Sequence, residues 1–385
     1  MSIVAGFAET CAVISLAYYL AAMLAAWRFA RIIAAPPAAM PAIIPQCAVL
    51  KPLRGLGANL AANLTSYLEL DYPRAEFYFG VSDDEDRAAE VPLALRDQYR
   101  FRPITLAVGQ APDCANRKVG KLIQMAELAA TADAYLISDA DIAVERDHLR
   151  RVAAELFAHD RVGVVSCLYR AQPGATLAAR LEALAVNTDF APLVMVSAAI
   201  EPMRYALGAT IAIRRATLEE IGGFRALKDL LADDYFIGKL AAGRGWEVRL
   251  SSSLVTTHAA EEKFSDFWNH QLRWARTYRT TRPLSLATIL LHGPFWALLA
   301  IFASGAGTFS LKLLVAVIAA RIAMAAYVAG RVLGVRGQMR DLWLVPLKDL
   351  CMTGIWFASL FSNRVLWAGR RLEIMRDGTM REVHG

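Results

Sequence analysis

A long uncharged run near the N-terminus is the feature that most constrains what this chain can fold into. From Thr10 to Trp27 the sequence TCAVISLAYYLAAMLAAW contains eighteen residues and no charged side chain. A helix of that length crosses the hydrocarbon core of a bilayer. Arg28 and Arg31 follow the run, and basic residues at this end place it in the cytoplasm. A cleaved signal peptide is the alternative, but its basic residues would precede the apolar run.

The composition fits a soluble domain joined to membrane segments. Hydrophobic residues make up 56% of the 385 residues and charged residues 20%. This mixture is too apolar for an ordinary soluble protein and too charged for membrane helices alone. The net charge is +6, and many basic residues lie beside apolar segments. That placement favours anionic lipid headgroups and excludes nucleic acid as the expected partner.

Residues 46–262 are predicted to form an α/β catalytic domain. Short β-rich runs such as EFYFGVSD and AYLISDAD alternate with helical patterns such as residues 116–130. This alternation indicates a mainly parallel sheet of the nucleotide-binding kind. Ligands bind such sheets beyond the carboxyl ends of the strands. Two of the predicted strands end in carboxylates there, at Asp83 and at the pair Asp139 and Asp141.

The remaining segments are predicted to anchor this domain in a membrane. They are an N-terminal transmembrane helix (1–33), a proline-rich linker (34–45), an interfacial amphipathic helix with the motif HQLRW (263–285), a transmembrane hairpin (286–333), and a re-entrant or interfacial segment with a basic tail (334–385). A helix packed in the core is the alternative for 263–285. Arg321, inside the hairpin, needs a partner because a charge there is costly, and Asp349 is our expectation. The chain is thus expected to be a multi-pass protein of the bacterial inner membrane with a cytoplasmic catalytic domain.

Four polar clusters follow one another along the chain. They are VSDDED with Asp83, SDADI with Asp139 and Asp141, LADDYF with Asp233 and Asp234, and HQLRW with His270, Arg273 and Trp274. Each alone has an ordinary explanation as a helix cap, a solvated turn, a helix N-terminus or an amphipathic surface. Together they supply what transfer from a nucleotide sugar needs: carboxylates for a divalent cation, an arginine for the diphosphate, and a separate base for the acceptor hydroxyl.

This ordered set of motifs resembles the ceramide glucosyltransferase family. The matching stretches are VLKPLRG, FGVSDDED, ANRKVGKL, SDADI, GATIAIRR, IGGF, ADDYFIG and HQLRWART, between Val49 and Thr277. The resemblance implies the GT-A fold of inverting transferases, a UDP-sugar donor, a membrane lipid acceptor and a divalent cation, Mg²⁺ or Mn²⁺. Ceramide, giving a β-glycosylceramide, is the expected acceptor. The alternatives are N-acetylglucosaminyl transfer to a hopanoid lipid and, from another class, a non-catalytic lipid-binding scaffold.

The resemblance also implies roles for the donor and metal residues. Asp83 matches the position that contacts the uracil and ribose side of the donor. Lys118, Asp139 and Arg273 are further candidates for donor binding, with Arg273 facing the diphosphate. Asp141, together with Asp139, is the candidate metal ligand.

For the acceptor side, the resemblance implies that Asp234 is the general base. Trp274, Asp233 and His270 are the candidates for acceptor binding. His270 departs from the family pattern, which usually has Gln or Arg there, although histidine still donates a hydrogen bond to phosphate. His258 is either a metal ligand or a polar residue that closes a strand.

Overall fold

The chain folds into two compact units, each built from separated parts of the sequence. The computed structural model describes residues 2–57, 59–367 and 369–383. The sheet unit comprises Ile32–Tyr169 and Ile200–His258. The helical unit comprises Met1–Arg31, Arg170–Ala199 and Ala259–Gly385. The sheet unit therefore contains an interruption, residues 170–199, that belongs to the helical unit.

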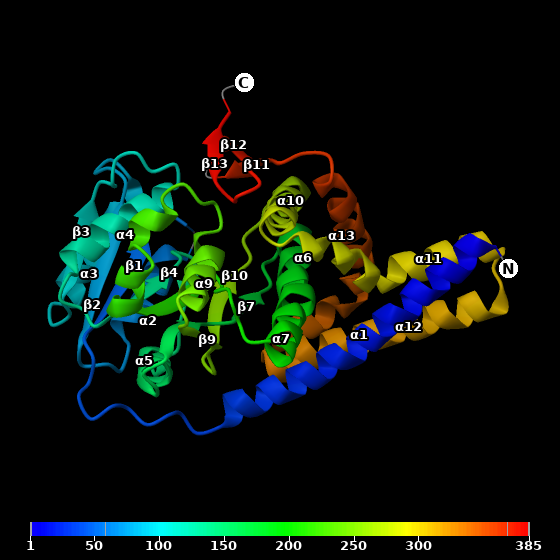
Figure 1. Cartoon of the computed structure of the whole chain (residues 1–385), viewed down its shortest axis with the longest axis horizontal. Coiled ribbons are helices and arrows are strands. Elements are labelled where there is room, and N and C mark those ends of the chain that lie inside the picture. The colour runs from blue at the N-terminus through cyan, green and yellow to red at the C-terminus, as the bar shows by residue number, and fades with distance from the viewer. Residues whose placement is uncertain (1, 58, 368, 384–385) are drawn as a thin grey trace. The chain divides into compact units, whose positions relative to one another are not determined.

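A seven-stranded sheet with the order β3-β2-β1-β4-β8-β6-β9 organises the sheet unit (Figure 1). Strands β3, β2, β1 and β4 are parallel, β8 is antiparallel to β4 and β6, and β9 is parallel to β6. The strands are β1 (Cys47–Pro52), β2 (Ala75–Val81), β3 (Ile104–Val108), β4 (Ala134–Ser138), β6 (Val162–Ser166), β8 (Thr210–Arg214) and β9 (Glu247–Leu250). Every residue of β1, β4 and β6 is buried, as expected of strands covered on both faces.

Helices connect these strands, and a short strand pair extends the end of β4. The helices are α2 (Leu60–Leu68), α3 (Glu90–Gln98), α4 (Arg117–Leu128), α5 (His148–Phe157), α8 (Arg215–Glu220) and α9 (Asp233–Gly243). Strand β5 (Ile142–Ala143) pairs antiparallel with β10 (Val255–His258). The chain leaves β1 toward β2 on one side and later returns to β4 on the other. This reversal is the switch point at which such sheets bind ligands.

The helical unit contains most of the apolar segments. Its elements are α1 (Ile3–Ala34), α6 (Leu177–Ala185), the π-helical turn η2 (Val186–Phe190), α7 (Ala191–Ile200), α10 (Phe264–Thr281), the 3-10 helix η4 (Pro283–Leu291), α11 (Gly293–Ser304), α12 (Thr308–Ala326), the π-helical turn η5 (Tyr327–Val332), the 3-10 helix η6 (Arg336–Leu344), α13 (Val345–Ser359) and the strands β11 (Arg364–Trp367), β12 (Arg370–Ile374) and β13 (Met380–Glu382). Strand β7 (Tyr169–Gln172) begins the segment that enters this unit from the sheet. Helices α1, α11 and α12 run alongside one another (Figure 1).

Among the residues that the structure describes, three helices are long and apolar enough to cross a membrane: Ile3–Ala34, Leu177–Ile200 and Thr308–Val332. The first and last coincide with spans predicted from the sequence. Leu177–Ile200 lies within the region assigned to the catalytic domain, where Glu182 and Asp189 interrupt the apolar pattern.

The first arm of the predicted hairpin is bent. Pro283–Leu291 and Gly293–Ser304 meet at an angle of 59°. Pro294 follows the bend, and proline cannot supply the N–H that would continue a regular helix there. Gly293 is required because a Cβ at that residue would lie 2.6 Å from the Tyr19 hydroxyl.

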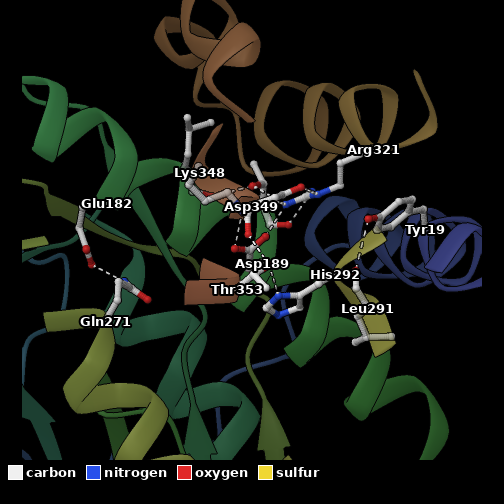
Figure 2. Close-up of polar contacts among 12 residues, drawn as sticks. Tyr19, Glu182, Asp189, Gln271, Leu291, His292, Arg321, Lys348, Asp349 and Thr353 are labelled. Atoms are coloured by element: carbon white, nitrogen blue, oxygen red, sulfur yellow. Dashed lines mark hydrogen bonds and ion pairs between the residues drawn. The ribbon is translucent and has the colours of Figure 1, made fainter. Parts of the chain in front are cut away.

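The partner expected for Arg321 is confirmed. Arg321 Nε donates to Asp349 Oδ2 at 2.8 Å, and a second carboxylate, Asp189, pairs with the same guanidinium. Lys348 Nζ lies 2.5 Å from Asp189 Oδ2 and 2.6 Å from Asp349 Oδ1. Figure 2 shows these four side chains pointing toward one another. The charges of the two cations and the two carboxylates cancel, which lowers the free-energy cost of burying these side chains.

Candidate active site

Two acidic loops leave the same edge of the sheet. Strand β2 ends at Val81 and β4 ends at Ser138, and both run parallel to β1, which lies between them. Asp83 and the turn containing Asp139 and Asp141 therefore follow the carboxyl ends of the two strands that flank β1. The Asp83 side chain is exposed to solvent. These loops stand at the switch point described above, where a nucleotide is expected to bind.

Lys118 joins two of the acidic clusters. It is the second residue of α4, whose N-terminus is capped by Asn116 Oδ1 accepting a hydrogen bond from the Val119 N–H at 3.1 Å. Lys118 Nζ lies 2.8 Å from Asp139 Oδ1 and 3.3 Å from Asp233 Oδ2. Burial alone would lower the pKa of Lys118, but the carboxylates Asp139 and Asp233 outweigh it and raise that pKa. The lysine thus remains a fixed positive charge among the acids.

Asp233 and Asp234 form the first turn of α9, where the helix dipole favours negative charge. Asp233 is only 5% exposed, and Asn116 Nδ2 lies 3.4 Å from its Oδ1. Burial and the charge of Asp233 raise the pKa of Asp234 to about 6, although Lys118 opposes the shift. A carboxylate of this pKa is ionised at neutral pH and basic enough to accept a proton.

Gly208 leaves the space that the Asp234 carboxylate occupies. A Cβ at Gly208 would lie 2.8 Å from Asp234 Oδ2, closer than nonbonded atoms approach. Farther along α9, a Cβ at Gly238 would lie 2.3 Å from the Tyr205 carbonyl carbon. Both glycines therefore allow α9 to approach the segment before β8, and this close approach positions Asp234.

The Asp141 carboxylate is exposed and is held by strand β10. Thr257 pairs with Ile142 in the β5–β10 ladder, and its Oγ1 donates to Asp141 Oδ2 at 2.8 Å. His258, the last residue of β10, is also exposed. Carboxylate oxygens at the end of a buried strand are the ligand type that Mg²⁺ and Mn²⁺ prefer, so Asp139 and Asp141 fit the expected cation.

These two carboxylates do not complete a metal site by themselves. Within the described parts of the chain, Glu182, Glu261 and His270 each offer a ligand atom that lies within 4.8 Å of the other two, whereas Asp139 and Asp141 belong to no such group of three His, Cys, Asp or Glu side chains. A cation at Asp139 and Asp141 would therefore take further oxygens from the donor's phosphates, as Mg²⁺ commonly does.

Lys51 supports the acidic turn after β4, a role that the sequence did not predict. Lys51 is fully buried in β1, and its Nζ donates to the carbonyl oxygens of Asp139 at 2.8 Å and Ile142 at 3.2 Å. The same Nζ lies 3.8 Å from the centroid of the Tyr67 ring. Burial lowers the pKa of Lys51 to about 7, against the opposing charges of Asp141 and Asp139. One feature of the sequence indicates a special role for Lys51, which is its position inside the otherwise apolar strand pattern CAVLKPL.

The HQLRW motif lies on α10, in the helical unit. Phe267 is fully buried and Gln271 is 3% exposed, so one face of α10 packs into the core. His270 Nδ1 lies 2.9 Å from Glu182 Oε1, which engages this imidazole with a carboxylate of α6. The Trp274 ring centroid lies 5.0 Å from that of His270 and 5.5 Å from that of Phe190. The motif's aromatic and imidazole groups therefore form one packed cluster. Arg273 lies between them in sequence on the same helix.

Comparison with known proteins connects this geometry to a family. Glycosyl transferase family 21 matches residues 8–380. Ceramide glucosyltransferases 1 and 3 of Caenorhabditis elegans are 26% and 25% identical to the chain over 233 residues, which cover 60% of this chain. The chain spans about half the length of these relatives, since the match covers 50% of each.

A solved structure shares the fold. The mannosyltransferase PcManGT from Pyrobaculum calidifontis, in complex with GDP-Man and Mn²⁺, has a TM-score of 0.52 and 20% identity, covering 91% of this chain and 99% of that chain. This likeness confirms the GT-A fold that the resemblance implied, and the family match confirms the resemblance inferred from the motifs. Because the match extends over nearly the whole sequence, this chain belongs to Glycosyl transferase family 21.

Proposed function

We propose that this protein transfers a hexose from a UDP-sugar to the hydroxyl of a membrane lipid, with inversion at the anomeric carbon and with ceramide as acceptor. The observation that carries the proposal is the position of Lys118 between Asp139 and Asp233. Asp234 is the next residue after Asp233 in the first turn of α9. This arrangement combines a fixed cation for the donor's phosphates with a separate carboxylate of raised pKa. The names of the C. elegans relatives point to ceramide.

The donor would bind at the carboxyl edge of β1, β2 and β4. Asp83 would contact the uracil and ribose side, while Lys118 and Arg273 would bind the diphosphate. Asp141, with Asp139, would hold a divalent cation, and the Mn²⁺ in the mannosyltransferase PcManGT supports this assignment. When bound, such a cation neutralises charge on the departing diphosphate.

Asp234 would take the proton from the acceptor hydroxyl as that oxygen attacks the anomeric carbon. A single in-line displacement inverts the configuration, so an α-linked donor gives a β-linked product. Trp274 and Asp233 would line the acceptor side. His270, paired with Glu182, would act there through the ring of Trp274, which it contacts. The apolar helices would hold the enzyme in the membrane with its catalytic unit in the cytoplasm, as Arg28 and Arg31 indicate.

The test is a reconstituted transfer assay. The full chain in lipid nanodiscs is supplied with Mg²⁺ or Mn²⁺, UDP-glucose or UDP-N-acetylglucosamine, and either ceramide or a hopanoid with a free hydroxyl. UDP release gives the rate, and mass spectrometry of the lipids identifies the product. A β-hexosylceramide is expected. An aminosugar-bearing hopanoid would replace the proposed acceptor, and UDP release without any glycolipid would overturn lipid transfer.

Variants test the base in the same assay. Asp234→Asn should lower turnover by about 10²–10⁴-fold, the usual contribution of general base catalysis, while UDP-sugar binding persists. Asp160→Asn, a matched change at an exposed aspartate of the sheet unit, should leave the rate unchanged. Near-normal turnover by Asp234→Asn would show that another group accepts the proton.

A further inference from the structure

A second group of potential metal ligands lies in the helical unit and is separate from Asp139 and Asp141. Glu182 is on α6, His270 is on α10, and Glu261 lies between β10 and α10. His270 Nδ1 is 2.9 Å from Glu182 Oε1 and 3.8 Å from Glu261 Oε1. One ligand atom from each of the three residues lies within 4.8 Å of the others.

Two buried carboxylate oxygens in this group have no hydrogen-bond partner among the described residues. They are Oε2 of Glu182 and Oε2 of Glu261. Glu182 is only 3% exposed, so water cannot readily solvate its carboxylate. A buried oxygen without a partner is costly, and native proteins rarely leave one. The orphaned oxygens therefore point to a bound group that supplies positive charge.

The charge of the group leads to the same conclusion. Two ionised glutamates carry two negative charges, and a protonated histidine would cancel only one of them. A divalent cation, with His270 neutral, cancels both.

The geometry suits a metal ion. Bonds of about 2.0–2.2 Å from Zn²⁺ to carboxylate oxygen or imidazole nitrogen, at tetrahedral angles, separate ligand atoms by roughly 3.4 Å. The observed separations of 2.9 Å and 3.8 Å bracket that value. Gln271 Nε2 donates to Glu182 Oε1 at 2.9 Å, as Figure 2 shows, and such an outer contact orients a ligating carboxylate.

We propose that Glu182, Glu261 and His270 bind a divalent transition-metal cation of the Zn²⁺ or Mn²⁺ class. Two carboxylates with one imidazole match the oxygen and nitrogen preferences of these ions. The ion joins α6, α10 and the segment before α10 at one point. It also fixes the imidazole ring that contacts Trp274, so it positions the aromatic part of the HQLRW motif.

The test measures metal binding directly, in the full chain carrying Asp141→Asn so that the proposed donor-site cation does not contribute. Equilibrium dialysis with Zn²⁺ as the probe should find one tight site per chain. Glu182→Gln and Glu261→Gln should each raise the Zn²⁺ Kd more than about tenfold, since even outer-sphere changes reach that size. Glu127→Gln, at an exposed glutamate of the sheet unit, is the matched control. Equal Zn²⁺ affinity in all these proteins would overturn the proposal.

A spectroscopic measurement covers the case in which the glutamine variants fail to fold. Co²⁺ added to the Asp141→Asn chain with all three ligands intact should give the intense visible absorption of a low-symmetry site. That absorption should disappear on addition of stoichiometric Zn²⁺. A spectrum identical to that of aqueous Co²⁺, together with NMR signals of a doubly protonated His270 ring, would show a proton in place of the metal.

Discussion

Asp234 should impose an acidic limb on the pH–rate profile. Burial and Asp233 raise its pKa from 3.8 to about 6, so the carboxylate is about 90% ionised at pH 7 and about 10% ionised at pH 5. Because the base must be ionised, kcat/KM should fall about tenfold between these pH values. An aspartate of ordinary pKa would still be more than about 90% ionised at pH 5, and the profile would be nearly flat.

The assay is initial-rate UDP release by the full chain in nanodiscs, at subsaturating donor and acceptor. Asp233→Asn removes a neighbouring negative charge that raises the pKa of Asp234, so the midpoint of the limb should move to lower pH. Asp160→Asn should leave the midpoint in place. A flat profile down to pH 5, or a midpoint that does not respond to Asp233→Asn, would refute the assignment of the limb to Asp234.

The same shift has a consequence for stability. The folded-state pKa of Asp234 lies above 3.8, so the folded chain binds this proton more tightly than the unfolded chain does. Stability from the protonated carboxyl is therefore present below about pH 4 and is lost as pH rises through about 6. At pH 7 the ionised group costs roughly 3 kcal/mol. Asp234→Asn should accordingly raise the unfolding midpoint at pH 7 and change it little at pH 4.

Three further substitutions test other parts of the structure. Lys51→Met should destabilise the sheet unit by about 1–3 kcal/mol, because two carbonyl oxygens of the acidic turn lose their hydrogen-bond donor. Denaturant unfolding measures this loss, and the Kd for the UDP-sugar should rise with it. Gly208→Ala should reduce kcat with little change in unfolding midpoint, since its Cβ displaces the Asp234 carboxylate; unchanged turnover would contradict this reading. Arg321→Met should cost about 3–5 kcal/mol, because Lys348 alone must then balance the charges of both Asp189 and Asp349. Adding Asp349→Leu should recover part of that loss, and no recovery in thermal unfolding would argue against the pair.

Local patterns in the sequence were enough to predict the membrane helix, the parallel sheet and the acidic residues at the strand ends. Apolar length and flanking arginines indicate the membrane helix at the N-terminus, because a span needs only a continuous segment. Strand–helix alternation predicts the parallel sheet, and parallel strands bring their carboxyl ends to one edge. The positions of Asp83, Asp139 and Asp141 at strand ends follow from that rule. Even the Arg321–Asp349 pair was predictable, since a buried charge needs an opposite one.

Tertiary structure decided which distant residues meet. Lys118 contacts Asp139 and Asp233 because α4 and α9 reach the same sheet edge, and no local pattern encodes that approach. The backbone contacts of Lys51 likewise depend on the register between β1 and β4. The motif indicated His270 as an acceptor-binding residue able to donate a hydrogen bond to phosphate, and it gave no sign of the contact with Glu182 that the packing of α6 against α10 creates. Periodicity reports the face that a residue occupies, whereas its partner depends on which other element covers that face.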